Sequence, residues 1–128
     1  MEKLSVRASR FFPALVALLT AGCLSEPTIE LTDAQQSELT AHAGVYHVCV
    51  AQIAARMDDG QSPVTRIAQI ALTYCKPEAA QVAAYLDSIK LPADAKALYL
   101  DQLSDVAARQ SALMLRRHRH PDWQSDNA

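Results

Sequence analysis

The sequence predicts an all-α fold, a small antiparallel bundle of about four helices with one disulfide. Aromatic residues make up 5% of the chain and Gly occurs three times, whereas Ala is abundant, a composition that favours helices over a sandwich or barrel. Apolar residues recur every three or four positions from residue 39 to residue 114, as on the buried faces of helices. Cys49 and Cys75 both fall on these apolar faces, so they can join two of the helices.

The N-terminal 22 residues have the three-part build of an export signal. A basic start is followed by an apolar run over residues 11–19 and then by small residues that lead into Cys23. This run is well short of the about 18 consecutive apolar residues that a membrane-spanning helix needs. We therefore expect residues 1–22 to be cleaved and to take no part in the fold. The basic residues of the start are Lys3, Arg7 and Arg10.

The end of this segment, Thr20-Ala21-Gly22-Cys23, resembles the lipobox of bacterial lipoproteins, although Thr20 stands where Leu is usual. The resemblance implies that the Cys23 thiol receives a diacylglyceryl group, that cleavage separates Gly22 from Cys23, and that the new amino group is acylated. The acyl chains of these lipid groups hold a protein firmly in a membrane, because each buried CH₂ contributes about 0.8 kcal/mol. The resemblance also implies a periplasm-facing envelope protein, and Leu24 favours the outer membrane over the inner. An ordinary secretory signal with an incidental cysteine is the alternative.

Cleavage at this point leaves 106 of the 128 residues, with nine Lys and Arg against thirteen Asp and Glu. This length fits one small helical domain, which we place at residues 32–120. Residues 23–31 then form the lipidated cysteine with a short tether, and residues 121–128 form a polar tail. The net charge of −4 gives no support for a nucleic-acid partner.

The first helix is expected to begin at Thr32-Asp33, which can cap it, and to end at Asp58-Asp59-Gly60. Gly60 can take the left-handed conformation that closes a helix. Ser62 is expected to cap the second helix, with Pro63 at its first position. The buried face of the first helix should carry Leu39, Ala43, Tyr46, Cys49, Val50, Ile53 and Met57.

The second helix is expected to stop or kink at Lys76, because Pro77 disfavours helical geometry at the residue before it. A third helix resumes at Glu78 and ends before Leu91-Pro92, and the last runs from about Ala93 to about Arg119. Short connections favour antiparallel neighbours. The expected buried residues of the second helix are Val64, Ile67, Ala71, Tyr74 and Cys75, those of the third Val82, Tyr85, Leu86 and Ile89, and those of the last Leu100, Leu103, Val106, Ala107, Leu113 and Met114.

Cys49 and Cys75 are the pair that remains for a disulfide once Cys23 is lipidated, in a compartment where such pairs oxidise. If the chain turns near residues 60 and 61, the two cysteines differ in distance from the turn by roughly 4–5 Å of helix rise, which a tilted helix pair can absorb. We therefore predict this bond, with two buried free thiols as the alternative. Redox catalysis is disfavoured, because reactive pairs usually have Cys-X-X-Cys spacing.

A basic cluster, Arg116, Arg117, His118, Arg119 and His120, ends the last helix. The simplest interpretation is electrostatic, because positive side chains at a helix C-terminus complement its dipole and can cover the last carbonyls. The second is a contact with anionic lipid headgroups or another acidic envelope surface, worth roughly 1 kcal/mol per basic side chain near a charged membrane.

The histidines do not predict a metal site. His42 and His47 are five residues apart, so on a helix they point about 140° away from each other. His118 and His120 could chelate a soft cation only weakly, and only if the helix frays before Pro121. We therefore expect no metal and no cofactor other than the lipid on Cys23.

No frame for catalysis is recognisable, because the chain lacks a Gly-X-Ser-X-Gly elbow and a Gly-rich phosphate loop. The carboxylates at turns and on polar helix faces, such as Asp58 and Asp59, are expected to be solvated. We expect a non-enzymatic, membrane-tethered accessory or scaffold lipoprotein that docks on an unidentified envelope protein. The alternative is a module that binds a small apolar ligand between its helices, lined by Tyr46, Tyr74, Tyr85 and Tyr99.

Overall fold

The computed structural model describes residues 29–124 of the chain. The chain divides into two units, Met1–Leu31 and Thr32–Ala128, and residues 29–31 of the first have no regular secondary structure. The expected signal segment, the cleavage site at Gly22 and the lipidation site at Cys23 lie outside the described residues. Within the described range, no helix has the length and apolar character needed to cross a membrane.

The second unit is all-α over the part that is described, which confirms the predicted fold class. Each predicted helix is present with bounds within about three residues of those expected. The elements are α2 (Asp33–Met57), α3 (Val64–Tyr74), α4 (Lys76–Ser88), α5 (Ala93–Arg119) and a short 3₁₀ helix, η1 (Pro121–Gln124).

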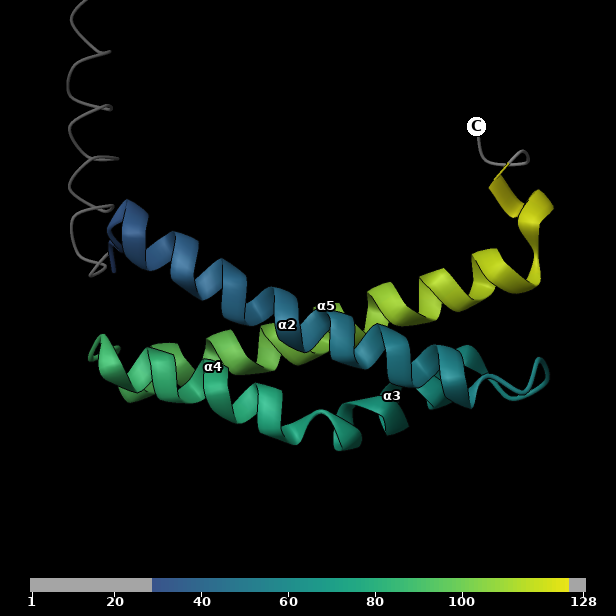
Figure 1. The fold of residues 1–128 in the computed structure, drawn as a ribbon, viewed down its shortest axis with the longest axis horizontal. Coiled ribbons are helices and arrows are strands. Elements are labelled where there is room, and N and C mark those ends of the chain that lie inside the picture. Colours follow the sequence, from purple (N-terminus) through teal and green to yellow (C-terminus); the bar gives the residue numbers. More distant parts are fainter. Residues whose placement is uncertain (1–28, 125–128) are drawn as a thin grey trace, which may run out of the picture. The chain divides into compact units, whose positions relative to one another are not determined.

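Three rods make up the bundle, because α4 continues in the general direction of α3 (Figure 1). The chain runs along α2, returns along α3 and α4, and runs back along α5, and α2 and α5 each pack against both α3 and α4. The second connection therefore does not form the expected antiparallel hairpin. A single residue, Cys75, separates α3 from α4, which is enough to bend the chain but too short to reverse it.

The predicted interruption before Pro77 is present, but it lies at Cys75, one residue before the expected position, and Lys76 is the first residue of α4. The Cys75 backbone has φ −108° and ψ 24°, outside the α-helical range, and its N–H donates to the carbonyl of Leu72 at 3.2 Å. Pro77 lies in the first turn of α4, where its missing N–H costs nothing. The interruption therefore places Cys75 at a fixed point between two helices.

The start of α2 is capped by the side chain predicted for it, whereas the start of α3 is not. The Thr32 hydroxyl accepts from the Gln35 N–H at 3.1 Å, and the Gln35 side chain accepts from the Thr32 N–H at 3.0 Å, a reciprocal capping box. Pro63, not Ser62, is the N-cap of α3, because the Ser62 hydroxyl donates to Asp59 at 2.6 Å instead. The Pro63 carbonyl accepts from the Ile67 N–H at 3.1 Å.

The core is built mainly of small and aliphatic side chains, and two predictions about it are wrong. Tyr74 is 62% exposed, whereas its neighbour Cys75 is fully buried. On α5, Leu103 and Ala107 are buried as expected, but the buried face continues through Ala108, Ala112 and Leu115, so Met114 is 36% exposed. The most buried core residues include Val50, Ala54, Ala68, Ala71, Val82, Leu86, Ala107 and Leu115.

Candidate functional site at the basic end of α5

The last turn of α5 carries four consecutive basic residues, Arg116 to Arg119. The helix ends just before Pro121, and the N–H of its C-cap residue, His120, donates to the Arg116 carbonyl at 2.9 Å. The dipole of a 27-residue helix favours positive charge at this end. The structure divides the basic cluster into one arginine that faces the bundle and residues that face solvent.

Arg119 is the arginine that faces the bundle. Its Nε donates to Asp58 Oδ1 at 3.0 Å, its Nη1 donates to the Ser62 carbonyl at 2.8 Å, and its Nη2 also pairs with Asp58. The Arg119 side chain is 15% exposed and that of Asp58 is 9% exposed. The hydrogen bond from Arg119 lowers the pKa of Asp58 most, and the same contact raises the pKa of Arg119. Arg119 therefore joins α5 to the α2–α3 connection and takes no part in an exposed surface.

The α2–α3 connection, residues 58–63, is organised by its two aspartates. The prediction that these carboxylates are simply solvated is therefore wrong. Asp58 Oδ1 accepts the Gly60 N–H at 3.0 Å, and Asp59 Oδ1 accepts the N–H groups of Gln61 and Ser62 at 2.9 and 2.7 Å. The hydrogen bond from the Ser62 hydroxyl, followed by those from the N–H groups of Ser62 and Gln61, lowers the pKa of Asp59 strongly. Gly60 has φ +74°, the left-handed conformation predicted for it.

Arg116, Arg117, His118 and His120 are exposed, in contrast to Arg119. Arg116 and Arg117 form no ion pair with any residue between 29 and 124. Each lines a shallow hollow that Leu113 also lines, of about 310 Å³ beside Arg116 and about 410 Å³ beside Arg117. Met114 contributes to the second hollow. The exposed part of the basic cluster thus lies next to apolar surface, and we call Leu113, Met114, Arg116 and Arg117 the α5 patch.

The two histidines of α2 have separate partners. His47 Nδ1 lies 3.0 Å from Gln110 Oε1 on α5, and the His42 ring lies 5.2 Å from the ring of Tyr85 on α4, centroid to centroid. The structure does not bring them together. Asp105 and Arg109, four residues apart on α5, form an exposed ion pair at 2.6 Å.

The four tyrosines do not share one environment. Tyr46 and Tyr85 are buried, and the Tyr85 hydroxyl donates to the Gln35 carbonyl at 3.2 Å. Burial raises the pKa values of Tyr46 and Tyr99. Tyr74 faces solvent, so it does not line a space between the helices. The packing therefore gives no specific support to the ligand-binding alternative.

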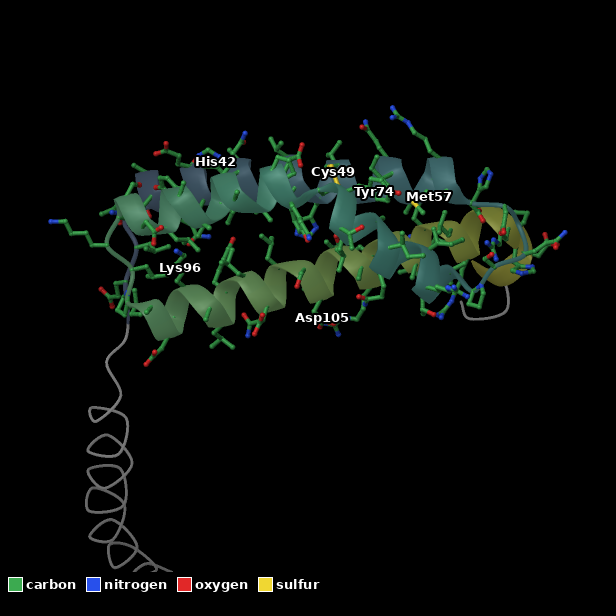
Figure 2. All side chains as sticks on the ribbon, turned by 90° about the horizontal axis from the view of Figure 1, so that it is seen from below. His42, Cys49, Met57, Tyr74, Lys96 and Asp105 are labelled. Atoms are coloured by element: carbon green, nitrogen blue, oxygen red, sulfur yellow. A yellow bond between two sulfur atoms is a disulfide. The ribbon has the colours of Figure 1, made fainter. Side chains whose placement is uncertain are left out.

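The predicted disulfide between Cys49 and Cys75 is present (Figure 2). It joins α2 to the bend between α3 and α4, with a Cα–Cα distance of 6.0 Å. Sequence reasoning missed a third residue at this place, Glu78, whose Oε2 is buried and has no hydrogen-bond partner among the residues described. The signal that could have found it is the spacing Cys75-Lys-Pro-Glu78, which puts both side chains on one side of a helical turn.

Comparison with models of protein families, with curated proteins and with solved structures finds no match to this chain.

Proposed function

We propose that this protein is a lipid-anchored accessory protein of the bacterial envelope, and that its α5 patch binds an acidic face of another envelope protein. The anchor is proposed from the sequence: cleavage after Gly22 and acylation of Cys23 would leave the protein held by its lipid in the outer membrane. The docking role is non-catalytic and needs no cofactor beyond the lipid.

One observation carries the docking role: Arg119 is held by Asp58, while Arg116 and Arg117 remain exposed beside Leu113 and Met114. If the basic residues served only the helix dipole, nothing would require an apolar surface beside them. Arginine and methionine are enriched at protein interfaces, and arginine pairs with carboxylates in a bidentate geometry. Because the rest of the domain is acidic, this end also orients the domain toward a negative partner.

Photo-crosslinking in cells tests the docking role. A crosslinking residue at position 113, in the α5 patch, should capture a defined envelope protein, which mass spectrometry then identifies. The same residue at position 101, which is exposed on the other half of α5, should not capture it. Capture from both positions, or from neither, would contradict docking through the α5 patch.

Charge variants give a matched control. Arg116→Gln with Arg117→Gln should abolish the crosslink, because the cations that pair with the partner are lost. Arg56→Gln with Arg66→Gln removes the same charge from exposed positions on α2 and α3 and should leave the crosslink intact. Equal loss in both double variants would show a net-charge effect only. If the protein bound anionic vesicles through these arginines but gave no protein crosslink, the α5 patch would be a lipid-binding surface, and the proposed protein partner would be wrong.

The anchor is tested separately. The intact mass of protein extracted from membranes should correspond to a chain that begins at Cys23 and carries acyl groups. Cys23→Ser should leave the protein unacylated and release it from the membrane fraction. An unmodified chain with a different N-terminus would refute the lipoprotein proposal and leave the docking test unaffected.

A further inference from the structure

Glu78 is half-buried, and the surroundings of one of its two carboxylate oxygens do not explain it. It lies in the first turn of α4, and its Oε2 is buried without a hydrogen bond to any described residue. A buried polar atom normally has a partner, because leaving it without one costs free energy. The carboxylate and the two sulfur atoms of the disulfide lie within 4.8 Å of one another. In the disulfide state, neither sulfur can donate a hydrogen bond to Glu78.

The positions of the three groups are fixed by the backbone. Cys75 and Glu78 are three residues apart across the start of α4, so their side chains lie on the same side. Cys49 approaches from α2, with its Cα 6.0 Å from that of Cys75. The three donor atoms therefore come from α2, from α4 and from the residue between α3 and α4, and they meet at the bend.

These donors match the ligands of zinc once the disulfide is reduced. Zn²⁺ takes thiolate sulfur at about 2.3 Å and carboxylate oxygen at about 2.0–2.2 Å in tetrahedral geometry. Tetrahedral angles then place two bound sulfurs about 3.8 Å apart. This separation is compatible with donor atoms that already lie within 4.8 Å of one another.

We propose that the reduced form of this protein binds one Zn²⁺ through Cys49, Cys75 and Glu78, with water in the fourth position. An external dithiol reduces the bond by supplying two electrons and two protons to the two sulfurs, and becomes a disulfide itself. Zinc binding then releases the two thiol protons. Because the same sulfurs form either the disulfide or the metal site, the disulfide and bound zinc exclude each other. The α5 patch contributes nothing here, so the site does not depend on the proposed docking role.

Cobalt titration tests the site on the full chain. The protein is reduced with a dithiol, freed of it under anaerobic conditions and titrated with Co²⁺. We expect one equivalent to bind, with thiolate-to-cobalt charge-transfer absorption and the d–d bands of a tetrahedral ion, and Zn²⁺ should remove both. The oxidised protein should give neither. Absence of thiolate absorption in the reduced protein would overturn the proposal.

Glu78→Gln tests the third ligand, because the amide keeps the size of the side chain but binds metal weakly. It should weaken Co²⁺ binding by about tenfold or more and change the d–d bands. Asp101→Asn, which removes an exposed carboxylate from α5, should change neither. Unchanged affinity and bands in Glu78→Gln would exclude Glu78 as a ligand and overturn the three-residue site.

X-ray absorption of the zinc-loaded wild-type protein covers the case in which Glu78→Gln fails to fold. It should show two sulfur ligands, with oxygen completing the shell. A shell of four sulfurs, or of oxygen and nitrogen alone, would overturn the proposal.

Discussion

The two connections that reverse the chain are held in different ways. Side chains organise residues 58–63, between α2 and α3, where Asp58 and Asp59 accept backbone N–H groups and Arg119 reaches in from the end of α5. Backbone bonds close residues 89–92, between α4 and α5, where the N–H of Leu91 donates to the Leu86 carbonyl at 3.1 Å. The Lys96–Asp87 pair near this second connection is at 2.7 Å, but Asp87 is 62% exposed.

The disulfide adds to the same contrast, because the loop that it closes contains the first connection and not the second. Cys49 and Cys75 are 26 residues apart and enclose the whole of residues 58–63. The end of the bundle that contains residues 58–63 is therefore held by ionic contacts and lies within a covalently closed loop, whereas the other end is held mainly by its backbone. We expect substitutions at the first end to have the larger effects.

Removal of the disulfide should have the largest effect. Cys49→Ala with Cys75→Ala should lower the free energy of unfolding by roughly 3–4 kcal/mol, because the unfolded chain regains the freedom of a 26-residue loop. Urea unfolding of the double variant and of the oxidised wild-type protein measures this difference. A change below about 1 kcal/mol would mean that the cross-link contributes little to the first end.

Loss of the Arg119 contact should follow. Arg119→Met keeps the apolar part of the side chain but leaves Asp58 without its cation, so we expect the thermal midpoint to fall by several degrees. Arg116→Met removes an exposed arginine from the same helical turn and should leave the midpoint almost unchanged. Circular dichroism measures the thermal midpoint of each variant. Equal shifts of the midpoint in the two variants would show that the pairing with Asp58 adds no stability.

Acid should weaken the first connection. The pKa values of Asp58 and Asp59 are lowered in the folded protein by their hydrogen bonds. Their contribution is therefore present above the unfolded pKa of about 3.9 and is lost as the pH falls below it toward the folded values. Asp59→Asn should flatten the fall of the urea midpoint between pH 5 and pH 2. A profile parallel to that of the wild-type protein would contradict this role of Asp59.

Substitutions at the residue with positive φ in each connection should change the free energy of unfolding in opposite directions. Gly60 and Lys90 both have positive φ, +74° and +57°. Gly60→Ala should destabilise by about 1 kcal/mol through backbone strain and not through a steric clash, because no atom beyond its two chain neighbours lies within 4 Å of an added Cβ. Lys90→Gly should stabilise by about 0.5–1 kcal/mol, because glycine adopts this conformation readily. Urea unfolding measures both, and destabilisation by Lys90→Gly would show that the Lys90 side chain matters more than its backbone.

The exposed ion pair beside the second connection should matter least. Lys96→Met should change the free energy of unfolding by about 0.5 kcal/mol or less, because solvent screens the interaction with Asp87. A double-mutant cycle with Asp87→Asn measures the pair alone. If the coupling free energy of this pair were as large as the stability lost in Arg119→Met, the contrast between the two ends would disappear.

The helix bounds were predictable because the signals are local. Thr32 with Gln35, Gly60 and Pro77 each act within a few residues of the boundary that they set. The disulfide was also predictable, since cysteines on two apolar faces left few other partners. The class of the fold follows from these elements alone.

The site was less predictable because its contacts join distant residues. Asp58 and Arg119 are 61 positions apart, and each alone has the pattern of a solvated charge at a helix end. The pattern of α5 could not decide between Met114 and Leu115, which are both apolar and adjacent. Glu78 was missed because in the sequence it has the pattern of an ordinary first-turn acid, and the burial of its Oε2 depends on neighbours that are distant in the chain.

The contact between Arg119 and Asp58 also sets the length of α5. One residue inserted between Leu103 and Arg119 would turn the guanidinium by about 100° around the helix and move it by about 1.5 Å along the axis. The insertion would break the register between the core and the pairing with Asp58. We therefore expect insertions and deletions among natural variants to be absent from the segment between Leu103 and Arg119.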